Sequence, residues 1–280
     1  MSRLWVLDMG SLCGWHYFAN PDGDNGMLAA LEGWLQEFAE RFNPSHVVAC
    51  FDAGNNFRNK IDPEYKLSRK TKPKPENFIA QLRQAPEAVA KRGIAVVRVD
   101  TFEADDLLAS VVARFSDEIE ITVVSEDKDL FCLVGERVQQ FAPAHGVFYD
   151  EAKVIEKLGI PPWRVPDYLA IAGDSSDGIK GIKGVGEVTA KYAIQHTKSA
   201  AEIFRKAAAG AFVDLKKGTQ AKLAAGRAEF DHAMELVRLR VDVPIPGELE
   251  AYTVRTPSDL EEYQPIYDII IPLVGDEIPF

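Results

Sequence analysis

The segment Val47-Val48-Ala49-Cys50-Phe51-Asp52 is a continuous apolar run that ends in a carboxylate, and Leu4-Trp5-Val6-Leu7-Asp8 has the same form. Such runs are typical of strands that are buried on both faces of a parallel sheet. Two further strands and three intervening helices are predicted, at 94–99 and 120–125 and at 27–42, 77–92 and 104–115, respectively. This alternation predicts an α/β fold with a central, mostly parallel sheet flanked by helices.

The chain divides into three parts by pattern. A sheet-centred core is expected over 1–150, a region that is helical throughout over 151–245, and an acidic extension over 246–280 with eight acidic residues and one base. Within the core, residues 53–76 have no apolar period and carry seven basic residues against three acids. A connection of this length is a functional loop, unless it is a solvated surface excursion.

Composition excludes several classes of protein. None of the 280 residues lies in an apolar run long enough for a membrane span, which needs about 18–20 residues. The three cysteines, Cys13, Cys50 and Cys132, are widely spaced and fit neither a disulfide framework nor a zinc site. A cytoplasmic protein with reduced thiols is therefore expected. The net charge of −11 by itself disfavours a protein whose whole surface attracts polyanions.

Acidic residues form the strongest chemical signal. Five short clusters at the ends of predicted elements contain nine of them: Asp8, Asp52, Glu103, Asp105, Asp106, Asp127, Asp129, Asp174 and Asp177. Ligands of open α/β sheets bind beyond the carboxyl ends of the strands, so these side chains are expected to converge there. Each acid alone is equally well explained as a helix cap or a turn residue.

Carboxylates gathered in one crevice repel one another unless cations neutralise them. An all-oxygen set of donors suits Mg²⁺ or Mn²⁺ and not zinc. Sites with two such ions commonly hydrolyse phosphodiester bonds, because the metals activate a water molecule and stabilise the leaving oxygen. The acidic clusters therefore predict phosphoryl chemistry.

A glycine-rich stretch over 178–190 is the second signal. It lacks the Lys-Ser/Thr pair of a phosphate-binding P-loop. Gly184-Val185-Gly186 precedes a predicted helix that begins near Glu187, so backbone amides at this turn are suited to a phosphodiester oxygen. A plain helical hairpin without a ligand fits the stretch equally well.

Taken together, the motifs resemble those of the structure-specific 5′ nucleases, which include flap endonucleases and the 5′-nuclease domain of bacterial DNA polymerase I. The matching segments occur in the family's order: Val6-Leu7-Asp8, Phe51-Asp52-Ala53, Phe57-Arg58, Tyr65-Lys66-x-x-Arg69, Phe102 to Ala109, Ser125 to Leu130, and Gly173 to Ala190. The resemblance implies a metal-dependent 5′-3′ exonuclease and flap endonuclease. Its expected substrate is branched or nicked DNA, or DNA with a free 5′ end, in replication or repair.

The resemblance also implies roles for the acidic residues. The first of two Mg²⁺ ions is expected at Asp8, Asp52, Glu103 and Asp105, with Mn²⁺ as a substitute. The second is expected at Asp105, Asp127, Asp129 and Asp177. Asp106 and Asp174 are expected nearby or to act through water.

The basic segment over 53–76 resembles a helical arch for a 5′ single strand. Lys66 and Arg69 are the expected catalytic residues at the scissile phosphate, and Arg58 is an expected DNA contact. Residues 178–196 resemble a helix-three-turn-helix that grips duplex phosphates. Its expected contacts are Lys183, Gly184, Gly186 and Thr189, with K⁺ at the backbone of Ile182 and Val185.

Five positions depart from the family pattern: Met9 replaces the usual Gly, Trp15 an Arg, Val188 a Lys, Gly178 an Asn and Lys180 a Pro. A monomer is expected, recruited by a replication or repair protein and without a membrane partner. Three rival interpretations remain. A non-catalytic flap-binding module would usually lose members of the acidic set, an RNA-cleaving nuclease would lack the arch and the glycine-rich grip, and an acidic adaptor would leave the aligned carboxylates unexplained.

Overall fold

The computed structural model describes residues 2–19, 26–54, 56–67 and 74–255. Its centre is a six-stranded sheet with the order β3-β2-β1-β4-β5-β6, in which every pair is parallel except β5 and β6. The strands are β1 (Arg3–Asp8), β2 (His46–Cys50), β3 (Ala95–Val97), β4 (Glu120–Val124), β5 (Val138–Ala142) and β6 (Val147–Tyr149). The predicted α/β fold with a mostly parallel sheet is confirmed.

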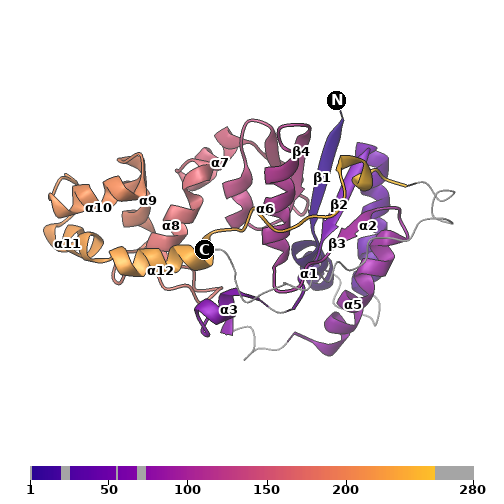
Figure 1. The fold of residues 1–280 in the computed structure, drawn as a ribbon, viewed down its shortest axis with the longest axis horizontal. Helices are drawn as coiled ribbons and strands as arrows, with labels where there is room; N and C mark the ends of the chain where they lie inside the picture. Colours follow the sequence, from indigo (N-terminus) through magenta and orange to yellow (C-terminus); the bar gives the residue numbers. More distant parts are fainter. Residues whose placement is uncertain (1, 20–25, 55, 68–73, 256–280) are drawn as a thin grey trace.

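Helices cover both faces of the sheet (Figure 1). Helix α6 (Ala104–Phe115) packs on one face, and the other is covered by α1 (Met9–Ala19), α2 (Gly26–Phe42) and α5 (Glu76–Ala90). Side chains alternate along β1: Leu4 and Val6 join the cluster of α6, whereas Trp5 and Leu7 join the cluster on the other side. The continuous apolar runs in the sequence follow from this burial on both faces.

The four strands and three helices predicted in the first half are all present, with ends shifted by up to two residues. Helix α1 and strands β5 and β6 were not expected. In α1 the buried residues Met9, Leu12, Cys13, His16 and Tyr17 do follow a helical spacing. Cys13 and His16 are not among the strongest apolar residues, however, so the period is easily overlooked.

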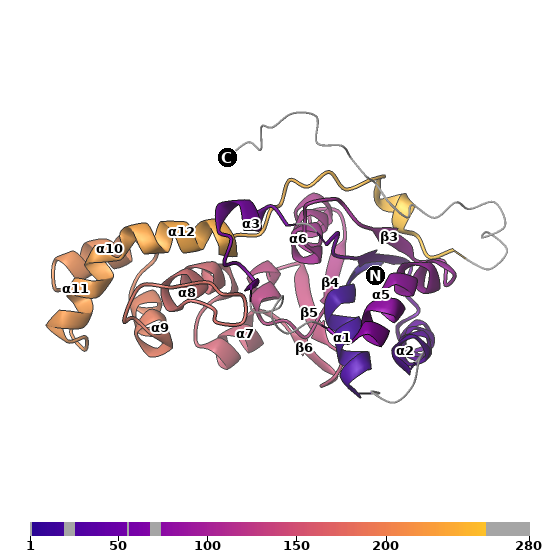
Figure 2. The ribbon, with the colours of Figure 1, turned by 90° about the horizontal axis from the view of Figure 1, so that it is seen from below.

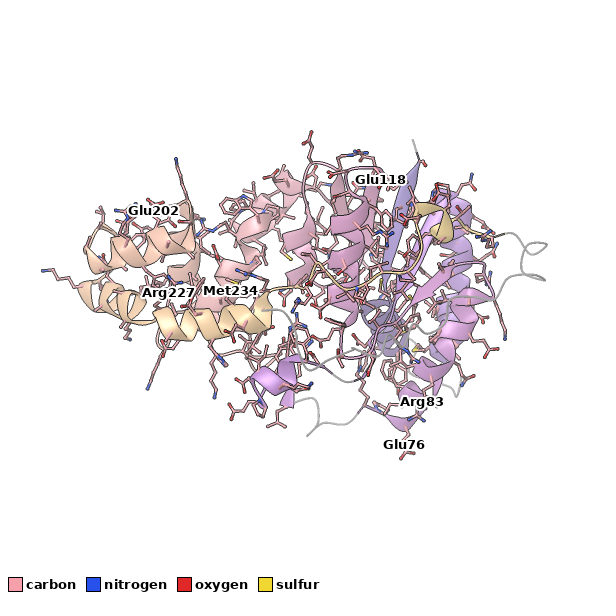
Figure 3. All side chains as sticks on the ribbon, in the orientation of Figure 1. Glu76, Arg83, Glu118, Glu202, Arg227 and Met234 are labelled. Carbon is pink, nitrogen blue, oxygen red and sulfur yellow. The ribbon has the colours of Figure 1, made fainter. Side chains whose placement is uncertain are left out.

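From residue 151 to residue 237 the chain is mainly helical and extends to one side of the sheet (Figures 1 and 2). Its helices are α7 (Glu151–Leu158), α8 (Val165–Ala172), α9 (Glu187–Gln195), α10 (Ala200–Ala208), α11 (Lys217–Ala225) and α12 (Arg227–Val237). Short helical turns are α3 (Arg58–Ile61), η1 (Asp129–Leu133), η2 (Pro162–Arg164) and η3 (Leu249–Tyr252). Figure 3 shows Glu202 and Arg227 at the end of the molecule that is remote from the sheet.

The sequence pattern predicts a single helix over 220–240, but the structure has two helices there, α11 and α12, so this prediction was wrong. They join at Gly226, where the side chain of Ile182 packs against the backbone. A Cβ atom at Gly226 would lie 2.3 Å from Cγ2 of Ile182. The turn therefore depends on a contact with a segment some forty residues earlier, which no local pattern reveals.

After α12 the chain returns to the sheet as an extended strap, residues 238–255 (Figure 2). Its side chains Val243, Ile245 and Tyr252 are buried in the cluster that contains α6. The backbone N–H of Arg255 donates to the carbonyl of Gly93 at 3.0 Å. The described start of the expected acidic extension, residues 246–255, thus packs on the core, and residues 256–280 lie outside the described residues.

None of the three cysteines forms a disulfide, and Cys13 and Cys50 are buried. Over the described ranges, no helix combines the length and the apolar character that crossing a membrane requires.

Candidate active site

The acidic site lies at the topological switch point of the sheet, between β1 and β4, where the order of the strands reverses. Strand β1 is central, with β2 and β3 on one side of it and β4 and β5 on the other. Ligands of open α/β sheets bind beyond the carboxyl ends of the strands at such a point. Asp8 ends β1, and Asp127 follows the end of β4. The charges of Asp127 and Asp52 both act on Asp8, so three of the predicted residues share this edge.

Asp8 is held in place by the first turn of α1 and by the residue that follows β4. Its carboxylate accepts hydrogen bonds from the hydroxyl of Ser125 at 2.6 Å and from the backbone N–H of Ser11 at 3.0 Å. The side chain is only 4% exposed. Burial, with smaller contributions from Asp127 and Asp52, outweighs these hydrogen bonds and raises the pKa of Asp8 to about 6.

Asp52 joins the end of β2 to the beginning of α6, because it accepts a hydrogen bond from the N–H of Ala104 at 2.8 Å. Gly10 lies between Asp52 and Asp8: a Cβ atom there would be 3.5 Å and 3.4 Å from their carboxylate oxygens. In sequence, Met9 replaces the glycine that is usual directly after the first aspartate of the family. The next residue, Gly10, is the one that leaves the space between the two carboxylates open.

The first turn of α6 contributes Glu103 and Asp105. Glu103 caps the helix, and its carboxylate accepts from Lys66 Nζ at 2.6 Å and from the hydroxyl of Tyr65 at 2.8 Å. Burial opposes ionisation of Glu103, but Lys66 and Arg58 outweigh it and lower its pKa. Burial and the charges of Asp8 and Asp127 raise the pKa of Asp105 well above its usual range.

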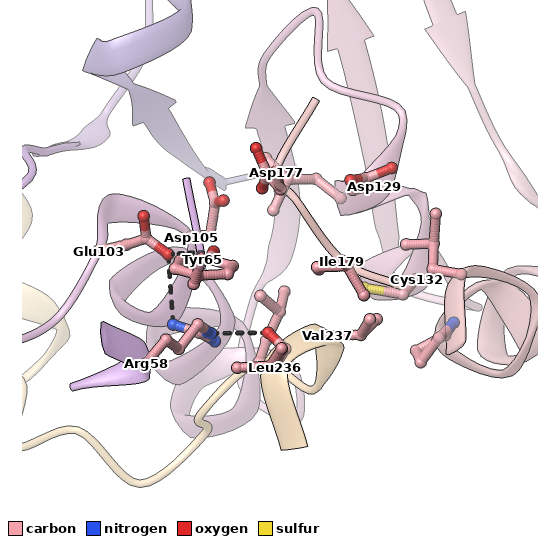
Figure 4. Close-up of a pocket in the computed structure, with 14 residues that line it drawn as sticks. Arg58, Tyr65, Glu103, Asp105, Asp129, Cys132, Asp177, Ile179, Leu236 and Val237 are labelled. Atoms are coloured by element: carbon pink, nitrogen blue, oxygen red, sulfur yellow. Dashed lines mark hydrogen bonds and ion pairs between the residues drawn. The ribbon is translucent and has the colours of Figure 1, made fainter. Parts of the chain in front are cut away.

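The other acids form a second group beside the first. Burial, followed by the charges of Asp127, Asp174 and Asp177, raises the pKa of Asp129 to about 7. Asp174 accepts from the backbone and hydroxyl of Ser176 at 2.8 and 2.7 Å. Asp129 and Asp177 line one pocket with Glu103 and Asp105, and Figure 4 shows the four side chains around it.

Lys66 connects the two acidic groups. Its Nζ lies 2.6 Å from Glu103 and 3.3 Å from Asp177, and its backbone N–H donates to the carbonyl of Asp177 at 2.7 Å. Burial lowers the pKa of Lys66, but the two carboxylates outweigh it and raise the pKa above its usual value. Lys66 is therefore a cation inside the acidic site. Arg69, the other expected catalytic residue, lies outside the described residues.

Two expectations need correction. Arg58, expected to contact DNA, is 1% exposed and makes a bidentate ion pair with Asp106, both distances being 2.7 Å. Asp106, expected near the metals, also accepts from the N–H groups of Arg240 and Glu103. The hydrogen-bonding atoms of both side chains are therefore occupied inside the protein, as a stable buried ion pair requires.

The donor set fits divalent metal ions in its chemistry. All of its charged atoms are carboxylate oxygens, which Mg²⁺ and Mn²⁺ prefer. The raised pKa values of Asp8, Asp105 and Asp129 show that these groups lack sufficient compensating charge, which cations would supply. Among the described residues, no three acids already enclose a common position for a metal.

The glycine-rich turn between α8 and α9 is fixed by buried contacts. Ile182 and Val185 are buried, and the N–H of Val185 donates to the carbonyl of Ile182 at 2.9 Å. Gly186 caps α9 without a side-chain hydrogen bond, so amides at its start are free for a ligand. Lys183 is exposed, Thr189 is half-buried, and Val188 is 85% exposed.

Lys222 of α11 is a further basic residue at this turn. A Cβ atom at Gly184 would lie 2.6 Å from Lys222 Nζ, so the lysine side chain crosses the glycine. No described acidic residue forms an ion pair with Lys222. The sequence does not indicate this contact, because Lys222 stands some forty positions after the turn.

Two family models together match nearly the whole chain. The N-terminal resolvase-like domain of 5′-3′ exonucleases matches residues 3–159, and the C-terminal SAM fold of 5′-3′ exonucleases matches residues 160–260. The chain belongs to the 5′-3′ exonuclease family. It is therefore a nuclease and a phosphodiester hydrolase, as the acidic clusters and their family resemblance predicted.

Relatives within the 5′-3′ exonuclease family include proteins that stand alone and parts of longer enzymes. The chain is 32% identical over 229 residues to the 5′-3′ exonuclease of Bacillus subtilis, covering 80% of this chain and 74% of the relative. It is 35% identical over 214 residues to DNA polymerase I of Thermus thermophilus, covering 76% of this chain and 24% of the polymerase.

The fold resembles that of the bacteriophage T5 5′-exonuclease. A structure of this protein with bound zinc matches with a TM-score of 0.74 and 21% identity, covering 84% of this chain and 89% of the phage chain. Another, described as the T5 flap endonuclease in a complex with DNA and metal ions, matches with a TM-score of 0.72 and 21% identity over 84% of this chain and 88% of the phage chain. These likenesses establish the fold.

Proposed function

We propose that this member of the 5′-3′ exonuclease family is a divalent-metal-dependent flap endonuclease as well as an exonuclease. Its substrate would be DNA with a 5′ flap, a nick or a free 5′ end. The observation that carries the proposal is the convergence of under-compensated carboxylates, Asp8, Asp105 and Asp129 among them, at the switch point of the sheet. The described T5 complex with DNA and metal ions supports it.

Two Mg²⁺ ions, or Mn²⁺ in their place, would be held by two overlapping sets of acids. Asp8, Asp52, Glu103 and Asp105 form the first set. Asp105, Asp127, Asp129 and Asp177 form the second, with Asp174 beside them. When bound, a metal pair of this kind makes a water molecule nucleophilic and stabilises the leaving oxygen of an in-line displacement.

Lys66 would act on the phosphate itself. Its ammonium already lies among Glu103 and Asp177, at distances of 2.6 and 3.3 Å. Bound metal would compete for these carboxylates and leave the ammonium free to stabilise negative charge on the reacting phosphate. The same role, stabilising negative charge on the reacting phosphate, is proposed for Arg69, three residues after Lys66.

Duplex DNA would be held by phosphate contacts at the glycine-rich turn. The free amides near Gly184 and Gly186, together with Thr189 and the ammonium groups of Lys183 and Lys222, suit phosphate oxygens. Lys222 would supply the positive charge that Val188 lacks. A K⁺ ion at the carbonyls of Ile182 and Val185 would add to this grip.

Catalysis and DNA binding would be carried out by different parts of the chain. Residues 1–150 would form the catalytic core, with an arch at 53–76 that admits a single strand, and residues 151–245 would hold the duplex. The acidic residues 246–280 would repel DNA, so that recognition is confined to the remaining surface. We further propose a monomer acting in the cytoplasm in DNA replication or repair, recruited by a protein of that machinery.

A cleavage assay tests the proposal. The purified chain is incubated with a 5′-labelled flap duplex and Mg²⁺, beside a variant with Asp127→Asn and Asp129→Asn. A control variant with Asp117→Asn and Glu118→Gln removes the same charge from two exposed acids that precede β4, at the opposite end of that strand from Asp127. Wild type and control are expected to cleave near the base of the flap, and the first variant is expected to be inactive.

Metal dependence is tested in the same assay. EDTA should abolish cleavage, and Mg²⁺ or Mn²⁺ should restore it. Cleavage that continues in EDTA, or in the Asp127→Asn and Asp129→Asn variant at the wild-type rate, would contradict the metal assignment.

A further inference from the structure

A single buried guanidinium joins three separate parts of the molecule. Arg58 lies at the start of the basic segment, and its Nε donates to the carbonyl of Leu236 at the end of α12, at 2.7 Å. Its Nη2 donates to the carbonyl of Arg238, in the strap, at 3.1 Å. Its Nη1 donates to Glu103, at the start of α6, at 3.3 Å (Figure 4). With the two bonds to Asp106, all five N–H donors of the group are used.

Asp106 completes the junction. Each of its oxygens accepts two hydrogen bonds: Oδ1 from Arg58 and the N–H of Arg240, and Oδ2 from Arg58 and the N–H of Glu103. The side chains of Arg58 and Asp106 are 2% and 0% exposed. No acceptor position of Asp106 is left for a metal, and no donor of Arg58 is left for DNA.

The junction lies directly behind the acidic site. Arg58 and Tyr65 both donate to Oε2 of Glu103, at 3.3 and 2.8 Å, while Oε1 accepts from Lys66. On its other side, Arg58 holds the end of α12, which packs against α8, the helix that leads into the glycine-rich turn. Arg58 thus contacts one catalytic carboxylate and the end of the helical region that would bind the duplex.

We propose that Arg58 is a positioning residue, which fixes the Glu103 carboxylate, and with it Lys66, relative to α12 and the duplex-binding helices. The inference rests on the proposed function and assigns a part of it that neither composition nor family resemblance gives. Lysine cannot replace this arginine, because it offers three donors from one atom and cannot form the bidentate pair with Asp106.

The first test removes the ion pair without leaving a lone buried charge. Arg58→Met combined with Asp106→Leu replaces two buried charges by apolar side chains, an exchange that buried ion pairs often tolerate. The matched control is Arg164→Met with Asp167→Leu. Arg164 is also 1% exposed and pairs with Asp167 at 2.6 Å, but neither residue lines the acidic pocket.

Three quantities are measured for each variant: the single-turnover rate on a 5′ flap, the affinity for that DNA in EDTA, and the affinity for Mn²⁺ by calorimetry without DNA. For the Arg58 and Asp106 variant, the rate and the Mn²⁺ affinity are each expected to fall by about 10- to 100-fold, as for other residues that orient metal ligands. DNA affinity is expected to stay within a few-fold of wild type. The control is expected to match wild type in all three.

Wild-type rate and Mn²⁺ affinity in the Arg58 and Asp106 variant would overturn the inference, as would equal losses in the control. A wild type that cleaves no 5′ substrate with any divalent metal would instead refute the proposed function. The calorimetry would still test Arg58 in that case.

A double-mutant cycle gives a second test that keeps the buried positive charge. If Arg58 acts through Glu103, Arg58→Lys should slow single turnover by about tenfold in the wild type but by much less in a Glu103→Gln background. Equal factors in the two backgrounds would show that Arg58 does not act through Glu103 and would overturn the inference.

Discussion

Replacing Asp129 by Asn should stabilise the metal-free protein near pH 8 and leave its stability unchanged near pH 4. The side chain is surrounded by other acids, Asp127, Asp174 and Asp177, and no described residue donates a hydrogen bond to its carboxylate. Burial and these charges raise its pKa from 3.8 to about 7. The asparagine amide carries no charge at either pH, so it relieves the repulsion without removing a hydrogen bond of the carboxylate.

The direction follows from proton linkage. Well below pH 3.8 the carboxyl is protonated in both the folded and the unfolded state and costs no stability, and near pH 4 the cost is still small. As the pH rises toward 7, the unfolded state loses its proton first, so the folded state is progressively destabilised. Above pH 7 the full cost remains. A shift of about three pKa units corresponds to at most about 4 kcal/mol, at about 1.4 kcal/mol per unit.

Denaturant unfolding in EDTA at pH 4 and pH 8 measures the effect, with the exposed Asp117→Asn as control. Asp129→Asn should raise the free energy of unfolding at pH 8 only, and the control at neither pH. In a separate measurement without EDTA, Mn²⁺ should stabilise wild type at pH 8, by about 2.7 kcal/mol at one hundred times its dissociation constant. Equal effects of Asp129→Asn at both pH values, or none at pH 8, would refute the assignment of Asp129 to an under-compensated acidic cluster.

Two further substitutions probe the basic residues. Lys66→Met should lower the single-turnover rate at saturating DNA by about 100-fold or more, the usual cost of removing a group that stabilises the transition state, while the DNA dissociation constant changes much less. An unchanged rate would exclude a role for Lys66 in the chemical step. Lys222→Ala should weaken duplex binding in EDTA and reduce the slope of log K against log salt by about 0.9, the value for one phosphate contact. Lys157→Ala, an exposed lysine of α7 that contacts Tyr149, is the control, and an equal slope in both variants would contradict the assignment of Lys222.

Local pattern accounts for much of the fold. Strands β1 and β2 are apolar along most of their length because helices cover both faces of the sheet, and that burial is visible as a run of apolar residues in the sequence. Strands β5 and β6 were not predicted. Strand β5 contains Gln139 and Gln140, and β6 is an edge strand that is half-buried along its length, so neither gives a comparable apolar run. The break at Gly226 was not predicted either, because it depends on the distant side chain of Ile182.

In the acidic site too, some residues could be predicted from local sequence and others only from contacts with distant parts of the chain. Asp8, Asp52 and Asp127 were predicted because each follows a strand, and parallel strands bring such residues to one edge of the sheet. Gly10 and Lys222 were not predicted, because their roles come from contacts with residues that are remote in sequence. Arg58 was assigned to DNA because it stands in a basic segment.

The sequence alone determined strands β1 to β4 and the acidic residues at their carboxyl ends, because the spacing of these residues follows the strands, and its motifs determined the nuclease family. Only the tertiary structure decided which charges face the site and which face one another. Arg58 and Lys66 stand eight residues apart in one basic segment. The side chain of Arg58 is buried and paired with Asp106, whereas that of Lys66 lies among the acids of the site. Charge is a property of the residue type, whereas burial and pairing depend on what the rest of the chain places beside it.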